Sequence, residues 1–199
     1  MKAVTLLTGS LGVDTVLTLT RPMCDALKRE GVRFVVRYLG GIGKDELATI
    51  LESGLACSFV TYAGVYDGAH SLKQAQDLGI PTGTIIWQDC EGVKMDAPSL
   101  IAQLTSWAHA MKDGGYVPGV YVGSEVPLTS QELYSLPHQR YWHSCSRVVD
   151  RDGREAGPSC GWAMYQLYPP NLTLAGVKVD IDIAQSDYRG RGVSVVIAD

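Results

Sequence analysis

The sequence predicts a compact (β/α)8 barrel of the α/β class, similar to a TIM barrel, with shortened late helices. Short apolar runs rich in β-branched residues alternate with longer amphipathic segments, as in repeated β/α units. Eight of these runs are predicted strands, which is the number that a closed barrel needs. The chain has 199 residues and no Pro/Gly/Ser-rich linker, so we expect one domain over residues 1–199.

A doubly wound open sheet would explain the alternation nearly as well. The chain lacks the Gly-x-Gly-x-x-Gly turn that would make dinucleotide binding attractive in such a sheet. We therefore favour the barrel. The eight predicted strands cover residues 12–16, 33–39, 55–62, 84–89, 116–122, 140–144, 161–167 and 179–183.

Helices are predicted between the early strands. Residues 21–30, 44–53 and 68–78 each end just before a glycine, the residue that most often follows a helix. Residues 97–112 form the clearest helix, because Pro98 lies in the first turn and two glycines follow. The last units have little room for full helices. Residues 192–197 are predicted to form an extra strand outside the barrel or at its base.

Composition limits the partners and the compartment. A formal net charge of −4 gives no electrostatic reason to expect nucleic acid, and no apolar run is long enough for membrane insertion. The apolar run near Met1 is too short for a secretion signal, so we expect synthesis in the cytoplasm without a signal peptide. Five widely spaced cysteines are typical of reduced, buried thiols. We expect a monomer.

Two carboxylates end the apolar run Thr84-Ile85-Ile86-Trp87-Gln88, and they are the most informative feature of the sequence. Alternate strand residues face the same side, so an extended Asp89-Cys90-Glu91 would place both acids together, about 6 to 7 Å apart along the backbone. Glycoside hydrolysis needs one protonated carboxyl group and one anionic group, and clustered carboxylates push their pKa values apart. The pair therefore predicts glycosidase chemistry.

Two further acidic clusters lie at predicted strand ends, where barrel enzymes place their reacting groups. Asp14 lies in the first predicted strand, residues 12–16, although a helix N-cap or a turn is the simpler interpretation of this residue alone. Asp180 and Asp182 lie within an apolar run, where charged residues are unusual unless the strand borders a polar cavity. At least one of the two is expected to line a site.

Other chemistries lack their motifs. The four histidines are scattered, with no His-x-His or His-Glu-x-x-His spacing, and we predict no catalytic metal and no cofactor. No Gly-x-Ser-x-Gly sequence supports a serine hydrolase.

The order of several short motifs resembles the glycoside hydrolase family 25 muramidases. It is even closer to a glycoside-hydrolase-like domain of unknown function, numbered 1906, whose members look like relatives of those lysozymes. The motifs are Gly12-Val13-Asp14, Phe34-Val35-Val36-Arg37-Tyr38-Leu39 followed by Glu46, Gly79-Ile80-Pro81, Asp89-x-Glu91, Tyr165-Gln166 and Val179-Asp180-Ile181-Asp182. Together they span nearly the whole chain. Family 25 members usually carry Trp-Gln where this chain has Tyr165-Gln166.

This resemblance implies a barrel that cleaves the glycan strands of bacterial peptidoglycan, as a phage endolysin or a bacterial lysin would after release or export. Glu91 would be the general acid/base, and Asp89 would assist attack by the substrate's own N-acetyl group. Asp14 and Asp182 would hold sugar hydroxyl groups or tune Glu91. We also expect other polar and aromatic side chains to contact substrate, with Asp180 the weaker choice beside Asp182. These are Arg37, Tyr62, Trp87, Tyr121, Tyr165, Gln166 and Asp180.

Some alternatives remain open from the sequence. Arg37 lies mid-strand, where a structural ion pair is as good an explanation as substrate contact. Most aromatic side chains on barrel strands belong to the core, and we expect Tyr62, Tyr121 and one tryptophan to reach the cleft. A non-catalytic glycan-binding or structural domain and a chitinase-like hexosaminidase are the competing functions.

Overall fold

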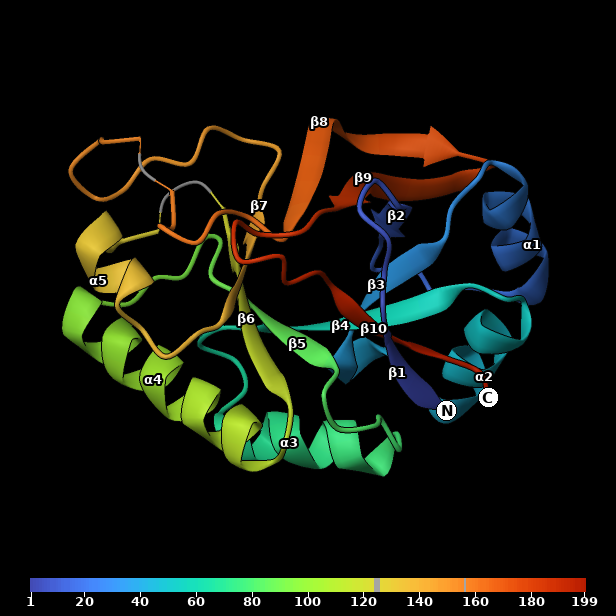
Figure 1. The fold of residues 1–199 in the computed structure, drawn as a ribbon, viewed down its shortest axis with the longest axis horizontal. Helices are drawn as coiled ribbons and strands as arrows, with labels where there is room; N and C mark the ends of the chain where they lie inside the picture. Colours follow the sequence, from blue (N-terminus) through green and yellow to red (C-terminus); the bar gives the residue numbers. More distant parts are fainter. Residues whose placement is uncertain (124–125, 156) are drawn as a thin grey trace.

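A computed structural model describes residues 1–123, 126–155 and 157–199, and it shows a closed barrel of eight strands (Figure 1). The strands are β2 (Leu11–Asp14), β3 (Phe34–Tyr38), β4 (Ala56–Tyr62), β5 (Ile85–Asp89), β6 (Val117–Val122), β7 (Arg140–His143), β8 (Met164–Leu174) and β9 (Val177–Ala184). Neighbours from β2 to β8 pair in parallel. The predicted α/β barrel is confirmed.

The last barrel strand differs from a regular (β/α)8 barrel. β9 pairs antiparallel with both β8 and β2. Only Ala175 and Gly176 separate β8 from β9, and both have positive φ angles, of 51° and 79°. Such a two-residue turn makes a hairpin, because a parallel connection needs a crossover of a dozen or more residues. The short link therefore reverses the direction of β9.

Two strands close the base of the barrel. β10 (Ser194–Ile197) pairs antiparallel with β1 (Lys2–Thr5) and touches β4 through a bridge between Val196 and Cys57. This confirms the extra strand expected at residues 192–197, whereas β1 was not anticipated. Val193 and Val195 are fully buried in the apolar cluster inside the barrel. β10 therefore fills the end of the barrel that lies opposite the carboxyl ends of the parallel strands.

The helices cover only part of the barrel. They are α1 (Arg21–Arg29), α2 (Lys44–Glu52), α3 (Gly68–Asp77), α4 (Ala97–Asp113) and the single-turn α5 (Ser130–Tyr134), with a short 3-10 helix at Leu39–Gly41. Figure 1 shows α1 to α4 along two sides, while the β8–β9 hairpin forms a side with no helix over it. The four predicted helices and the reduced late helices are confirmed. No helix in the described residues is long and apolar enough to cross a membrane.

Strand alternation separates an inner core from an outer one. In β3, Phe34 and Val36 pack inside the barrel, whereas Val35 packs outside against the helices. The inner core is tight around Phe34, since a Cβ atom at Gly12 would lie 2.1 Å from the end of the Phe34 ring. Glycine on β2 is thus required by the ring of Phe34, and it fixes the spacing of the two strands beneath the barrel mouth.

Candidate active site

A cavity of about 260 Å³ opens where the parallel strands end. Asp14 is the last residue of β2, Tyr38 of β3 and Asp89 of β5, so these strands deliver their final side chains to one place. The cavity is lined by Asp14, Tyr38, Val60, Asp89, Glu91, Tyr121, Trp142, Cys145, Ser146, Gln166, Pro170, Asn171 and Asp180. Four of these residues are acidic and none is Lys or Arg, so the described lining favours a neutral or cationic ligand.

Asp89 and Glu91 both line this cavity, but by a different route from the one predicted. β5 stops at Asp89, whose Oδ1 atom accepts a hydrogen bond of 2.8 Å from the backbone N–H of Glu91. An aspartate that captures an N–H two residues ahead makes a turn in place of further strand. Glu91 therefore lies in a turn, exposed, with its side chain over Gly123. A Cβ atom at Gly123 would lie 2.6 Å from Glu91 Oε1, so glycine is needed there.

Asp89 is a carboxyl group with an elevated pKa. Its side chain is only 5% exposed, and burial raises the pKa to about 6, against the hydrogen bonds from Glu91 N–H and Tyr38. The Tyr38 hydroxyl donates to Asp89 Oδ2 at 3.0 Å, and the Tyr38 ring stacks on Tyr62 at 4.2 Å. Asp89 therefore changes its charge near pH 6, within reach of physiological conditions.

A hydrogen-bonded chain crosses the cavity from Tyr121 to Asp14. The Tyr121 hydroxyl donates to Gln166 Oε1 at 2.9 Å, and the backbone N–H of Cys145 donates to the same oxygen at 3.2 Å. Gln166 Nε2 in turn donates to Asp14 Oδ2 at 2.9 Å. Burial raises the pKa of Asp14 to about 6, and the bond from Gln166 opposes that rise. Gln166 thus links β2, β6 and β8 and orients Asp14.

Asp180 and Asp182 exchange the positions that the sequence suggested. Because β9 is antiparallel, Asp180 pairs with Asp14 at the rim, while Asp182 pairs with Gly12 deeper in the barrel. Asp180 lines the cavity and accepts a hydrogen bond from the backbone N–H of Asn171. Asp182 is fully buried and does not line the cavity. The sequence slightly preferred Asp182 over Asp180 as a site residue, whereas in the structure Asp180 lines the cavity and Asp182 lies below it.

Asp182 lies next to Asp14, whose charge acts on it. Burial, and after it the charge of Asp14, raise the pKa of Asp182 well above its usual value. Within the described residues, neither Asp182 oxygen has a hydrogen-bond partner of standard geometry. Burial beside the carboxyl groups of Asp14 and Asp180 makes the charged form so costly that Asp182 keeps its proton. Asp182 therefore tunes the cavity from below as a neutral acid.

Arg37 and Trp87 do not contact the cavity. Arg37 points outward from β3, is 1% exposed and pairs with Glu46 of α2, with an Nε–Oε1 distance of 2.9 Å. It also donates to the backbone oxygen of Thr15, so the structural ion pair is the correct alternative. Trp87 faces the barrel interior beneath Asp89, fully buried, and its indole N–H donates to Ser58 Oγ at 3.0 Å. Neither side chain lines this cavity, although Arg37 borders an adjoining hollow that shares Tyr38 with it.

Tyr165 also lies away from the cavity. It points outward from β8 and stacks on His143 at 5.4 Å, whereas its neighbour Gln166 points inward. Tyr62, which is 40% exposed, borders a second hollow of about 310 Å³ that shares Tyr38 with the cavity. The tryptophan that reaches the cavity is Trp142. Trp142 follows the outward-facing Tyr141 on β7, so strand alternation turns Trp142 inward. This alternation would have identified Trp142 as the tryptophan at the cavity.

Tyr38 was missed as a site residue although its signal was present. It alternates with the apolar Phe34 and Val36 and ends its strand, which is the pattern of an inward residue at the mouth. Cys145, Ser146 and Asn171 lie in loops or irregular strand, and no periodicity marks such residues.

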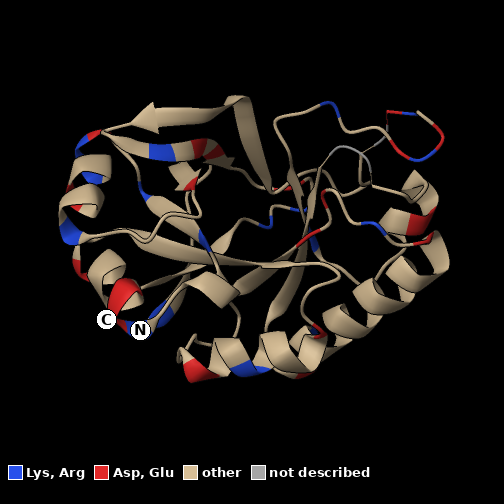
Figure 2. Cartoon of the chain, turned by 180° about the vertical axis from the view of Figure 1, so that it is seen from behind, with Lys and Arg blue, Asp and Glu red and all other residues tan. Residues whose placement is uncertain are grey.

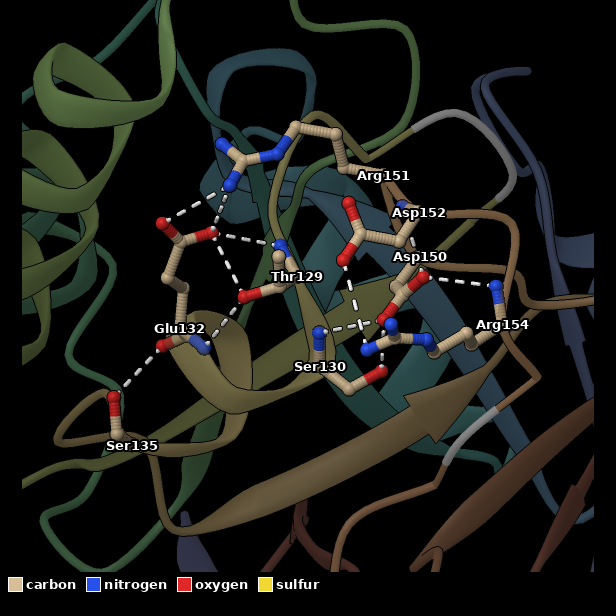
Figure 3. Close-up of polar contacts among 8 residues, drawn as sticks. All are labelled: Thr129, Ser130, Glu132, Ser135, Asp150, Arg151, Asp152 and Arg154. Atoms are coloured by element: carbon tan, nitrogen blue, oxygen red, sulfur yellow. Dashed lines mark hydrogen bonds and ion pairs between the residues drawn. The ribbon is translucent and has the colours of Figure 1, made fainter.

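The loop after β7 forms one wall of the cavity and is tied down by Asp150 (Figure 3). Asp150 Oδ2 accepts from the Ser130 hydroxyl at 2.9 Å, and Oδ1 accepts from the backbone N–H groups of Asp152 and Arg154. The N–H groups of Arg154 and Ser130 lower the pKa of Asp150 to about 2. Thr129 and Glu132 form a capping box on the adjoining α5. The wall is therefore anchored through the start of α5.

Charge elsewhere on the molecule is mixed. Figure 2 shows Lys and Arg interspersed with Asp and Glu over helices and loops, without an extended basic face in the described residues. Among those residues, no group of three or more His, Cys, Asp or Glu side chains is arranged to hold a metal ion. The chemistry that the described cavity can supply is thus proton transfer and charge stabilisation by carboxyl groups.

A family model described as "Rv2525c-like, glycoside hydrolase-like domain" matches residues 25–183. No curated protein matches the chain. The chain is similar to the solved structure of an uncharacterized B. stearothermophilus protein, with a TM-score of 0.67, 18% identity, and coverage of 88% of this chain and 96% of that one. A putative fructose-1,6-biphosphate aldolase from Coccidioides immitis matches at a TM-score of 0.45 and 10% identity, covering 68% of this chain and 54% of that one. The first similarity shows a shared fold, whereas the second is too weak to support any conclusion about the fold.

Proposed function

Because the chain belongs to the Rv2525c-like glycoside hydrolase-like domain family, we propose that it hydrolyses the glycan strands of bacterial peptidoglycan, in the manner of the family 25 muramidases. The observation that carries this proposal is the placement of Asp89 and Glu91 on one cavity at the barrel mouth. Glycosidases work with a pair of carboxyl groups, of which one donates a proton and the other remains anionic.

Glu91 is the general acid/base in this proposal. Its side chain is exposed at the cavity, so the oxygen of a bound glycosidic bond can reach it. Asp89 is held in place by the Tyr38 hydroxyl and the N–H of Glu91, and it orients the substrate's acetamido group and stabilises the positive charge that develops there. An acetamido group that attacks the anomeric carbon removes the need for a protein nucleophile.

The walls of the cavity fit a sugar polymer. Trp142 and Tyr121 supply ring surfaces inside the cavity, and Tyr38, Tyr62 and Tyr66 border the hollow beside it. Flat rings with polar tips stack on pyranose faces while their hydroxyl groups remain hydrogen-bonded. The absence of Lys and Arg from the described lining fits an uncharged glycan segment at the cleaved bond. To meet such a substrate, the protein must be exported or released to the cell wall.

The test compares wild type with Glu91→Gln on purified peptidoglycan, and Glu30→Gln on the exposed end of α1 is the matched control. We expect wild type and Glu30→Gln to clear the suspension and to release muropeptides with new reducing-end N-acetylmuramic acid, seen by mass spectrometry. Glu91→Gln keeps its shape but cannot transfer the proton, so its turnover should fall by at least about 10²-fold with glycan binding retained.

The remaining outcomes separate the alternatives. Unchanged turnover in Glu91→Gln would remove Glu91 from the reaction. Co-sedimentation with sacculi but no product from wild type, over pH 4 to 8, would favour a non-catalytic glycan-binding domain. Release of products from chitin alone would favour a chitinase-like hexosaminidase.

A further inference from the structure

A separate pocket of about 220 Å³ lies at the other end of the barrel. His138 and Gln139 precede β7, Cys160 precedes β8, and Arg189 and Arg191 follow β9, so the pocket adjoins the ends of the strands opposite the acidic cavity. The two lining sets have no residue in common. At liquid density the volume corresponds to roughly seven water molecules, which is enough for an anionic group and part of the molecule that carries it.

Three guanidinium groups gather around this pocket beside a single carboxylate. Arg191 is paired with Asp187 at 2.7 Å, and Asp187 also accepts from the backbone N–H of Arg189. Burial lowers the pKa of Arg140, and the positive charge of Arg191 lowers it further, which shows that the two groups repel each other. One carboxylate cannot balance three cations, so the local charge is positive.

Among the described residues, only Arg191 of these three arginines is in an ion pair, and Arg189 is the more exposed of the other two. Within the described residues, the Arg189 guanidinium makes no ion pair or side-chain hydrogen bond, although Arg189 is exposed and lines the pocket. The charges of Arg189 and Arg191 both act on Tyr141, so both lie near this tyrosine. Tyr141 and Ser159 add hydroxyl groups to the lining, and no acidic residue belongs to the described lining. Donors and positive charge thus converge on one space.

We propose that this pocket binds a small oxyanion, a phosphate or carboxylate group, with Arg189 as its main ligand. Hydrogen bonds from a guanidinium group to an oxyanion are charge-assisted and about twice as strong as neutral ones. The fork of donors on arginine also matches the oxygen atoms of phosphate and carboxylate. The site is independent of the proposed hydrolase activity, because it lies at the opposite end of the barrel.

The test titrates the ¹⁵N-labelled full chain with sodium phosphate and, separately, with sodium acetate at constant ionic strength. We expect saturable shifts of the amide signals of residues 158–161 and 187–191 with at least one anion. Arg189→Gln should weaken this binding about tenfold, the value of one lost charge-assisted hydrogen bond. Arg29→Gln, an exposed arginine on α1, should leave it unchanged.

Each arm decides a separate point. Tighter binding of phosphate assigns a tetrahedral anion, tighter binding of acetate assigns a planar one, and equal binding assigns the shared oxyanion chemistry. Shifts that never saturate with either anion, or equal affinity in a well-folded Arg189→Gln, would overturn the proposal. A dispersed amide spectrum of the variant establishes that it is folded.

Discussion

Asp182 keeps its proton inside the barrel, below the cavity that it does not line. The unfolded chain releases that proton above about pH 4, whereas the folded chain keeps it. Rising pH therefore stabilises the unfolded state. We expect Asp182→Asn to match wild type in stability below pH 4 and to become more stable above it, by up to about 1.4 kcal/mol per pH unit.

Urea unfolding of both proteins between pH 3 and pH 7 measures this difference. Asp113→Asn, at the exposed end of α4, is the control for the loss of one carboxyl group at the surface. A constant difference between wild type and Asp182→Asn would mean that Asp182 is ionised in the folded protein.

Titration of Asp89 is expected to determine how the hydrolytic activity falls at acidic pH. With a pKa of about 6, Asp89 loses its negative charge as pH falls through 6, so hydrolysis that needs the anion should decline there. The Tyr38 hydroxyl favours the charged form, so Tyr38→Phe should move the titration of Asp89 to higher pH. Carbon-detected NMR of the aspartate carboxyl groups follows this directly. Tyr66→Phe, in the hollow that Tyr38 also lines, is the control and should leave the titration of Asp89 unchanged.

At the scale of residues, strand position accounts for some of the side chains at the cavity and not for others. Asp14, Tyr121 and Gln166 were placed on strands and do face the cavity. Glu91 reaches it through a turn, because Asp89 captures a backbone N–H, and no period encodes that event. For Arg37 the sequence left two directions open, because neighbouring strand residues point alternately toward the cavity and toward the helix layer. In the structure Arg37 points toward the helix layer and pairs with Glu46.

At the scale of elements, the buried pair of Arg37 and Glu46 joins β3 to α2 and also accepts the N–H of Leu19. Arg37→Met would leave the Glu46 charge buried without its partner. We expect a loss of about 3–5 kcal/mol in the free energy of unfolding, measured by urea denaturation. Arg21→Met, in an exposed pair with Asp25, should cost less than about 1 kcal/mol.

An ion pair that is solvated, and not buried, would give a different result. If Arg37→Met lost as little stability as Arg21→Met, the pair would be solvated in solution and not buried as the structure has it.

The loop anchored by Asp150 is a second test at this scale. Asp150→Ala removes the acceptor of several hydrogen bonds, so amide hydrogen exchange in residues 128–155 should accelerate roughly tenfold or more. Asp152→Ala, which removes an exposed pair with Arg154 at 3.6 Å, is the matched control. Equal exchange in the two variants would show that the loop is held by other contacts. The sequence indicated a loop here but not its anchor, because Ser130 and Asp150 are 20 residues apart.

At the scale of the whole molecule, β10 seals the barrel, and the inward Val195 is part of the seal. Val195→Ala should cost about 1–3 kcal/mol, since the cavity it leaves cannot collapse easily. Val16→Ala, at a residue that is 71% exposed, should change stability by less than about 0.5 kcal/mol. Thermal or urea unfolding compares them, and equal stability would mean that β10 is loosely attached.

Closure of the barrel could be predicted because eight strand-like runs were visible in the chain. The direction of β9 could not, because that depends on Ala175 and Gly176 adopting positive φ angles. β1 was missed since it is short and only half-buried, and it is held by pairing with a partner almost the whole chain away. Distant pairing of this kind leaves no local pattern.

The hairpin that reverses β9 also carries an irregularity. Leu167 pairs with Ile181 and Leu172 with Val179, so β8 advances five residues over a stretch in which β9 advances two. The extra residues of β8 form an overhang, in which Pro170 and Asn171 line the cavity. The pairing of β9 with β2 is regular, so Asp180 and Asp182 face inward independently of the extra residues in β8. Insertions or deletions in this overhang would therefore narrow or widen the entrance to the cavity, while the regular pairing of β9 keeps Asp180 and Asp182 on the inner face.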